Sequence, residues 1–480
     1  MIRTPAGHAG FEASAAHPKT AALRRSVGPL RIPNYRRWFG GQLVSISGNW
    51  MQIVAEMWLV LSLTGSAFAV GMTSALQFLP ILLIGAWGGL IADRVDKRRL
   101  LLVTQGLMAL PALTLFALAT TGEIEAWMVM ALVFARGSVL AIDMPARQSF
   151  VIEIVGAERL VGAVGLQSVL IHASRITGPA IAGILIATGG IEICFLLNGL
   201  SFAGMIVALR SLDRDQLAHH EPVAREPGAV RDGLRYVMRT PELAIPLGMM
   251  ALVGTLAFNF QVLLPLLASR TFDGDAASYS GLVVAMGVGA IAGALATGAR
   301  ERISERLLIG SALLFGAFAL VAAGAPSLCW EALALVPVGA ASVTFAAGIN
   351  STLQLAADPH MRGRVMALYS IVFLGSTPIG GPVTGWLSGE FGPRVALVVG
   401  GLAALTAGVG AWIAFRRVAA SRGRAAAPAA SASAAGPGKG QACEPAESGR
   451  TRARAPRRSG PRHDPRSPAR RPPAAATPKR

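Results

Sequence analysis

Hydrophobic segments long enough to cross a lipid bilayer constrain the fold of this chain more than any other feature. A helix needs about 20 predominantly apolar residues to cross the hydrocarbon core, and we count twelve such segments. They lie approximately at residues 38–63, 67–92, 99–120, 126–146, 164–188, 191–211, 243–268, 279–299, 306–324, 329–354, 364–388 and 394–415. Only 15% of the 480 residues are charged, which is too little for a water-soluble surface of this size. The sequence therefore predicts an all-α membrane protein with twelve transmembrane helices.

The two halves of the chain share a pattern that indicates an internal duplication. An offset of 203 residues aligns Gly178-Pro179 with Gly381-Pro382, and the same offset places Glu56 opposite Asn259. Duplicated sets of apolar spans are typical of membrane carriers whose binding site lies between two related bundles. We therefore expect two pseudo-symmetric six-helix bundles around a central site.

Polar stretches divide the chain into five predicted regions. Residues 212–242 are polar and interrupt the apolar spans midway, which indicates a linker between the bundles. Residues 416–480 are rich in Ala, Pro and Arg without periodicity, a composition typical of disorder. The predicted regions are a cytoplasmic N-terminal lead (1–37), a first six-helix bundle (38–211), a cytoplasmic linker (212–242), a second six-helix bundle (243–415) and a basic disordered tail (416–480).

The net charge of +18 comes largely from the tail, which contains runs such as RTRARAPRRSGPR (450–462). Aromatic residues are not interleaved with these cations, so we expect no nucleic-acid partner. We expect the tail to lie near anionic lipid headgroups, where each cation contributes about 1 kcal/mol; recruitment of an acidic partner is the alternative. Basic residues also gather in alternate loops between the spans, and the positive-inside rule then places both termini in the cytoplasm.

The segment GGLIADRVDKRRLL (88–101) follows the second span and combines small residues with charges. Glycines allow two helices to approach closely, an acid can stabilise the N-terminus of a neighbouring helix, and the cations can pair with acids or helix C-termini. Together these residues predict a cytoplasmic latch whose closing favours one of two bundle orientations; a loop that only fixes topology is the alternative. The latch residues are Gly89, Asp93, Arg94, Lys97 and Arg98.

Residues 88–99 resemble the signature loop of the major facilitator superfamily, with Asp96 where the commoner form has Gly. More narrowly, QLVSISGNWMQIVAEMWLVLSLTGSAFAVGM (42–72), IDMPARQSFVIEIV (142–155) and SRITGPAIAG (174–183) resemble the enterobactin-exporter-like and macrolide-efflux-like branch of drug:H⁺ antiporters. The resemblance covers roughly residues 30–415. It implies a multi-pass carrier of the bacterial inner membrane that expels a small molecule, such as a drug or siderophore, against entering protons.

A Gly-Pro pair in the fifth span resembles the antiporter motif of that superfamily, and a similar pair stands at the equivalent place in the second half. Proline removes a helical hydrogen bond and permits a bend, while small neighbours allow tight packing against another helix. The same residues would equally serve a packing kink without bearing on transport direction. The motif residues are Gly178, Pro179, Gly183, Gly381, Pro382 and Gly385.

Polar side chains inside the apolar spans predict a central substrate cavity, because such residues are costly in lipid and usually face water or one another. They recur at helical spacing in the first, fourth, fifth and seventh spans. The predicted cavity residues are Asn49, Gln52, Glu56, Arg136, Arg175, Thr255 and Asn259.

Three residues are candidates for proton coupling. Glu56, near the middle of its span, could exchange a proton as the cavity opens to either side; contact with a cationic cargo and a permanent ion pair with an Arg are the alternatives. Asp143 lies one turn from Arg147, which favours a gate salt bridge over a proton site. His172 could titrate near neutral pH, or simply pack.

The chain has no phosphate-binding loop, nucleophile motif or metal-ligand spacing. We therefore expect no enzyme activity, no cofactor and no metal, and energy from an ion or solute gradient. The predicted function is a monomeric secondary active exporter of a small amphipathic molecule, with protons and the lipid bilayer as its other partners. An uptake carrier of the same fold and a non-transporting receptor or scaffold are the alternatives.

Overall fold

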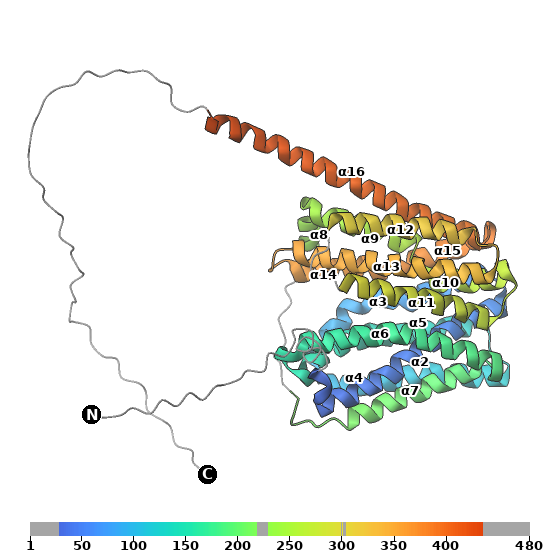
Figure 1. Ribbon diagram of the computed structural model, residues 1–480. Helices are drawn as coiled ribbons and strands as arrows, with labels where there is room; N and C mark the ends of the chain where they lie inside the picture. Colours follow the sequence, from blue (N-terminus) through green and yellow to red (C-terminus); the bar gives the residue numbers. More distant parts are fainter. Residues whose placement is uncertain (1–27, 218–228, 299, 301–303, 435–480) are drawn as a thin grey trace, which may run out of the picture. The chain divides into compact units, whose positions relative to one another are not determined.

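A computed structural model describes residues 28–217, 229–298, 300 and 304–434 (Figure 1). Most of the predicted lead (1–27), the middle of the predicted linker (218–228) and most of the predicted tail (435–480) lie outside the described residues. Within the described residues, all regular structure is helical. The helices are η1 (Gly28–Arg31), α2 (Pro33–Thr64), α3 (Ala67–Arg94), α4 (Lys97–Thr121), α5 (Ala126–Val155), η2 (Ala157–Arg159), α6 (Leu160–Gly189), α7 (Glu192–Arg210), α8 (Ala229–Arg239), α9 (Pro241–Leu256), α10 (Phe260–Leu266), the π-helical η3 (Leu267–Thr271), α11 (Ala276–Gly298), α12 (Glu305–Ala323), α13 (Leu328–Ala356), α14 (Arg362–Gly375), α15 (Thr377–Glu390) and α16 (Pro393–Ala434).

Eleven helical segments of the described chain are long and apolar enough to cross a membrane. Helix α2 is not one of these eleven because the polar side chains along it, including Gln52 and Glu56, lower its hydropathy, although its 32 residues exceed the length of a span. Two spans are interrupted: one combines α9, α10 and η3, and another combines α14 and α15. The chain is thus an all-α, multi-pass membrane protein, and α2 completes a set of twelve spans.

Helix ends follow local capping chemistry. Helix α2 ends at Gly65, whose positive φ of 60° lets its N–H reach the Leu61 carbonyl at 2.8 Å. One residue later, the Ser66 hydroxyl accepts a hydrogen bond from Ala69 N at 3.2 Å and starts α3. These two caps turn the chain back on itself within two residues, which makes α2 and α3 consecutive antiparallel spans.

The helices of each half pack mainly on one another. In the first half, α2 packs against α6 and α7, α3 against α5, and α4 against α5 and α7. In the second half, α13 packs against α9, α11 and α12. The halves meet through α3 on α15 and through α6 on α11, and Figure 1 shows α3 and α11 between the other helices of the two halves.

Glycines form the seam where α3 and α6 of the first half meet α15 and α11 of the second. A Cβ atom built on Gly381 would lie 2.8 Å from the Gly71 carbonyl oxygen, and one on Gly385 would lie 2.5 Å from the Ala67 oxygen. A Cβ on Gly183 would lie 2.7 Å from the Ser280 Cβ. These positions accept no side chain without a shift, because atoms cannot approach so closely. Backbone therefore packs directly on backbone between α3 and α15, and the small Ser280 side chain packs on the Gly183 backbone between α6 and α11.

Gly178 faces its own half of the molecule. A Cβ on Gly178 would lie 2.6 Å from the Ser47 oxygen of α2, and the adjacent Pro179 is buried. Gly183, Gly381 and Gly385 face the other half, and Pro382 lies beside Gly71. The two Gly-Pro pairs therefore occupy equivalent places in the sequence but make different contacts. Gly178 contacts α2 of its own half, whereas Gly381 contacts α3 of the other half.

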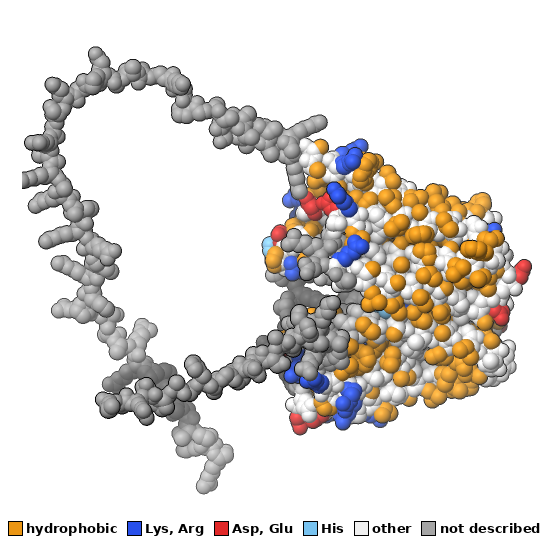
Figure 2. Space-filling view, in the orientation of Figure 1, with side chains coloured by type: hydrophobic (Ala, Val, Ile, Leu, Met, Phe, Trp, Pro, Cys, Tyr) orange, Lys and Arg blue, Asp and Glu red, His pale blue; other side chains and the backbone are white. Residues whose placement is uncertain are grey.

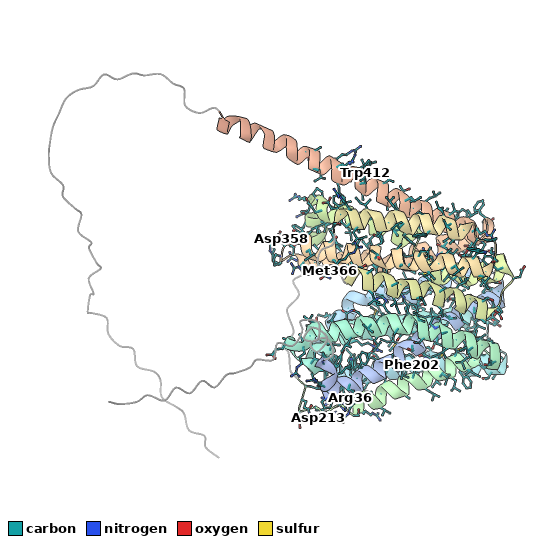
Figure 3. The ribbon with its side chains drawn as sticks, viewed as in Figure 1. Arg36, Phe202, Asp213, Asp358, Met366 and Trp412 are labelled. Atoms are coloured by element: carbon teal, nitrogen blue, oxygen red, sulfur yellow. The ribbon has the colours of Figure 1, made fainter. Side chains whose placement is uncertain are left out.

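Charge distinguishes the two ends of the bundle. We call one end of the bundle the basic end. It holds the α3–α4, α5–α6 and α13–α14 connections, which contain Arg94, Lys97, Arg159 and Arg362. Figure 2 shows Lys and Arg gathered at this end and a belt of hydrophobic side chains between the ends, as expected for a surface that faces lipid. Arg36, Asp213 and Asp358 also lie at the basic end (Figure 3).

The segment predicted as a linker contains a helix that the sequence analysis did not anticipate. Helix α8 packs on α14, buries Val237 and leaves Met238 exposed. The Tyr236 hydroxyl donates a hydrogen bond to the Asp358 carboxylate at 3.0 Å. Apolar and basic residues alternate along α8 at helical spacing, so its sequence carries the signal of an amphipathic helix.

Candidate functional site

A cavity of about 570 Å³ lies between the two halves, a size typical of small-molecule sites. Its first-half wall includes Trp50 of α2 and His172 and Arg175 of α6. Its second-half wall is mostly aromatic and aliphatic, and it includes Phe258 and Phe373. The halves pack closely at the end opposite the basic end, where Gly71 meets Gly381 and Ala67 meets Gly385.

Two interrupted helices border the cavity. Helix α9 ends at Leu256 and α10 starts at Phe260; between them, Asn259 donates a hydrogen bond to the Thr255 carbonyl at 2.7 Å. The other break separates α14 from α15, where the Ser376 hydroxyl donates to the Phe373 carbonyl at 2.8 Å. Discontinuous helices in carriers typically lie at the substrate site, because their free backbone groups need a polar or wet environment.

The cavity brings together some of the predicted site residues. Arg175 and Asn259 belong to its lining, and so does the proton-coupling candidate His172. The other predicted cavity residues lie outside the lining in this structure: Asn49, Gln52, Glu56, Arg136 and Thr255. Their contact with a cargo stays a prediction.

The rotation of α2 about its axis explains why its polar residues Asn49, Gln52 and Glu56 do not line the cavity. Trp50, Ile53 and Val54 of α2 line the cavity, and their spacing of three and four residues defines one helix face. Gln52 and Glu56 are fully buried and bond to α5 and α7 instead. The sequence located the polar stripe of α2 correctly but could not tell toward which neighbour it points.

Glu56 anchors a buried polar network inside the first half. Arg136 of α5 donates to the Glu56 carboxylate at 2.5 Å, and Gln52 donates to its other oxygen at 2.7 Å. Asn198 of α7 donates to the Gln52 amide oxygen, and Ser201 donates to Asn198 at 2.9 Å. The network joins α2, α5 and α7. Of the roles considered for Glu56, this arrangement favours the ion pair with an arginine.

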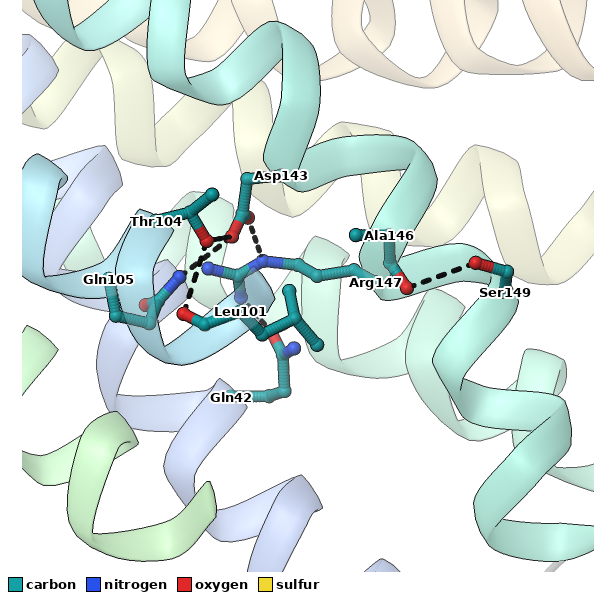
Figure 4. Close-up of polar contacts among 8 residues, drawn as sticks. All are labelled: Gln42, Leu101, Thr104, Gln105, Asp143, Ala146, Arg147 and Ser149. Atoms are coloured by element: carbon teal, nitrogen blue, oxygen red, sulfur yellow. Dashed lines mark hydrogen bonds and ion pairs between the residues drawn. The ribbon is translucent and has the colours of Figure 1, made fainter. Parts of the chain in front are cut away.

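Asp143 anchors a second buried network, nearer the basic end (Figure 4). Arg147 pairs with the Asp143 carboxylate and also donates to the Gln42 amide oxygen at 2.6 Å. Thr104 and Gln105 of α4 donate to the other Asp143 oxygen at 2.6 Å and 2.8 Å. All four partners belong to the first half, so this network ties α2, α4 and α5 together.

The predicted latch residues make contacts within the first half. Lys97 pairs with Glu153 at 2.5 Å, and Arg98 donates to the Leu209 and Arg210 carbonyls, both at 2.8 Å, at the C-terminus of α7. Gly89 is buried in α3, and Asp93 and Arg94 end that helix. A latch that reaches the second half stays a prediction for another conformation.

Sequence reasoning missed several residues that build these sites. Asn198 and Ser201 were overlooked, although a polar pair three residues apart in an apolar span is a signal for an inward-facing polar contact. Trp50 and the aromatic wall of the second half were also missed. Aromatic residues in an apolar span give no such signal, because they serve equally well in the core or facing lipid.

The fold and site define a class of protein. Twelve spans in two halves, with a cavity at the seam and breaks in its bordering helices, form the architecture of a major facilitator transporter. The chain belongs to the transmembrane secretion effector family, whose model matches residues 24–436. It is accordingly a membrane transporter of the major facilitator superfamily and not an enzyme.

Curated relatives include efflux proteins. The chain is 26% identical over 369 residues to macrolide efflux protein A of Streptococcus pyogenes, covering 73% of this chain and 88% of that protein. It is 27% identical over 380 residues to the multidrug efflux pump Tap of Mycolicibacterium fortuitum, covering 76% and 92%. It is also 26% identical over 263 residues to the staphyloferrin A transporter of Staphylococcus aureus, covering 54% and 65%.

Solved structures share the fold. The nucleoside transporter NupG superposes with a TM-score of 0.63 at 11% identity, covering 80% of this chain and 99% of that one. A bacterial homologue of the iron transporter ferroportin in an inward-facing state superposes with a TM-score of 0.60 at 16% identity, covering 82% and 98%. At such low identity these structures bear on the fold alone.

Proposed function

We propose that the protein is a secondary active exporter of a small amphipathic molecule in a bacterial inner membrane, driven by proton antiport. The observation that carries the proposal is the cavity between the halves, together with the close packing of the halves at the end opposite the basic end. The macrolide and multidrug efflux relatives support the export direction.

The charge of the basic end supports an orientation. Cytoplasmic loops of membrane proteins carry an excess of Lys and Arg, so the proposal has the basic end and both termini on the cytoplasmic side. The seam of Gly71, Gly381 and Gly385 then lies on the outer side of the membrane. In this arrangement the cavity is loaded from the cytoplasm or the inner leaflet, as export requires.

Glu56 remains the proposed proton carrier, and its partner Arg136 suggests how a proton would act. Protonation of the Glu56 carboxylate would weaken the ion pair and release Arg136 inside the first half. That change would loosen the contact between α2 and α5 rather than alter the cavity wall directly. His172, which lines the cavity, is the alternative carrier, and Asp143 with Arg147 serves as a gate salt bridge.

Transport direction is tested in membrane vesicles that contain the full chain. Under an imposed pH gradient, inverted vesicles should accumulate fluorescent amphiphiles from a panel that includes anionic, neutral and cationic compounds. Accumulation in right-side-out vesicles instead would identify an uptake carrier and overturn the export proposal.

Coupling is tested in the same vesicles with Glu56→Gln. We expect this variant to lose gradient-driven accumulation, whereas Glu390→Gln, which alters an exposed acid at the opposite end, should retain it. Gradient-driven transport that survives in Glu56→Gln removes Glu56 from the coupling role.

A further inference from the structure

The lining of the cavity has an uneven charge. Among the described residues that form it, the basic side chains are Arg175 and His172, and acidic side chains are absent. Arg175 stays protonated at any physiological pH. The wall therefore presents a fixed positive charge to whatever occupies the cavity.

Arg175, which is half-buried, differs from Arg136 and Arg147, two buried arginines of the first half. Arg136 pairs with Glu56 and Arg147 pairs with Asp143. Arg175 forms no ion pair with a described carboxylate, and its guanidinium lies over the Trp50 ring, 4.9 Å from the centroid. A cation held in a membrane protein without a counter-ion is costly, so the site is suited to an anion that arrives with the cargo.

His172 extends this cationic site. It lies three residues before Arg175 on α6, a spacing that places both side chains on one helix face. The His172 Nδ1 atom is buried and has no hydrogen-bond partner among the described residues. The α6 wall thus offers a planar guanidinium, which binds carboxylates with two parallel hydrogen bonds, beside an imidazole that is free to bond.

The opposite wall offers apolar contact. Phe258 lies near Phe373, with ring centroids 6.3 Å apart, and Phe373 stacks on Tyr369 at 5.7 Å. These three rings all belong to the lining of the cavity. A molecule that spans the cavity therefore meets a cation on one side and an aromatic cluster on the other.

We infer that the cargo is an amphipathic organic anion. Its carboxylate or similar anionic group binds Arg175 and His172 on α6, and its apolar body lies against Phe258, Tyr369 and Phe373 of the second half. This inference rests on the proposed function, in that it takes the cavity to be the transport site. Cationic amphiphiles bind less well, because no acidic side chain of the described lining offsets the charge of Arg175.

The test compares probes that share a fluorophore and an alkyl chain but differ in charge. Dansylated aminoundecanoic acid, its methyl ester and dansylated diaminodecane are anionic, neutral and cationic, respectively. Binding of each to the purified full chain is measured by fluorescence at pH 7.5. We expect the acid to bind about tenfold or more tightly than the ester, since hydrogen bonds to a charged group contribute about 1.5–3 kcal/mol, and the cationic probe to bind weakest.

Variants of Arg175 assign this preference to the site. Arg175→Gln should abolish most of the difference between acid and ester by weakening binding of the acid far more than that of the ester, and Arg175→Lys should retain part of the difference. The matched control is Arg416→Gln, which removes a guanidinium that also lies over a tryptophan, 4.0 Å from the Trp412 centroid, but outside the cavity lining. An unchanged acid-to-ester ratio in Arg175→Gln, or preferred binding of the cationic probe by the unmodified chain, overturns the inference.

Binding and transport separate this inference from the proposed export. Binding of the acid that depends on Arg175 supports the inference, whatever the transport result. Failure of inverted vesicles to accumulate the acid would then count against export but not against an anionic ligand. Accumulation of the ester or the cationic probe in preference to the acid supports export but contradicts an anionic cargo. A thermal unfolding curve for each variant confirms that the compared proteins are folded.

Discussion

The two halves of this transporter share a sequence pattern at an offset of 203 residues but differ in how they hold their helices together. At the positions that correspond to Glu56 and Arg136, the second half has Asn259 and Gly339. A Cβ on Gly339 would lie 3.1 Å from Ala290 N and even closer to the Met286 carbonyl, so α11 occupies the space that an arginine would need. At these positions a buried ion pair joins the helices of the first half, whereas the helices of the second half pack through close backbone contact.

This difference coincides with a difference in helix continuity. Helices α2 and α6 run unbroken through the first half, whereas the corresponding spans of the second half are interrupted near Asn259 and Ser376. Both breaks border the cavity. The first half is thus built as a cross-linked block, and the second half supplies the irregular backbone around the cavity.

The largest effect should come from removing one partner of the Glu56–Arg136 pair. Arg136→Gln should lower the free energy of unfolding by about 3–5 kcal/mol, because it leaves a buried carboxylate without its counter-ion. Unfolding in mixed micelles titrated with SDS measures the change. The double variant Glu56→Gln/Arg136→Gln should recover most of the loss, and additive effects of the two substitutions would contradict a coupled pair.

A smaller loss is expected for Gln52→Leu. This substitution removes the hydrogen bonds that Gln52 makes with Glu56 and Asn198, leaving buried polar atoms unsatisfied at a cost of about 1–3 kcal/mol. The same unfolding titration measures it. A stability equal to that of the unmodified chain would show that the network does not cross-link the first half.

The break in the second half should tolerate change better. Asn259→Ala should cost about 1 kcal/mol, since it removes one hydrogen bond to the Thr255 carbonyl at the end of α9. Because Asn259 lines the cavity, the variant should also alter probe binding more than Gln52→Leu does. The reverse order of binding effects would mean that the first-half network, not the helix break, shapes the site.

The smallest effect is expected at Thr255, the counterpart of Gln52. Its hydroxyl donates only to the Ala251 carbonyl of its own helix, at 2.8 Å. Thr255→Val should therefore change the unfolding free energy by less than about 0.5 kcal/mol. A loss as large as that of Gln52→Leu would remove the asymmetry between the halves on which the comparison depends.

The sequence predicted the class of fold because transmembrane spans obey a simple rule. Long apolar windows suffice to locate most of the helices, and the predicted all-α membrane fold was confirmed. The major facilitator fold, which the resemblance of residues 88–99 implied, was confirmed by the family match. The breaks at Asn259 and Ser376 were not predicted. The first has no proline at the break itself, whereas Pro378, in the first turn of α15, was an available signal for the second. Helix α8 was missed because its polar, proline-containing surroundings were interpreted as a linker.

Site residues were harder to place than helices. The stripe that includes Asn49, Gln52 and Glu56 was recognised from its spacing, yet Arg136, 80 residues away, determines where Glu56 points. Such a pairing depends on the rotation of two helices about their axes, which a single sequence does not encode in any local pattern. Arg175 and Asn259 do line the cavity, Arg175 from α6 and Asn259 from the break between α9 and α10.

The glycine seam between α3 and α15 also bears on how fast the molecule can switch. Where Gly71 meets Gly381, backbone packs on backbone and the two helices do not interlock through side chains. At the same end, Arg270 of the second half donates to the Gly65 carbonyl of the first half and to the Ser388 carbonyl of its own half. Parting of the outer face therefore has to break a charged hydrogen bond at its rim, while the helix contact itself can open without repacking of side chains.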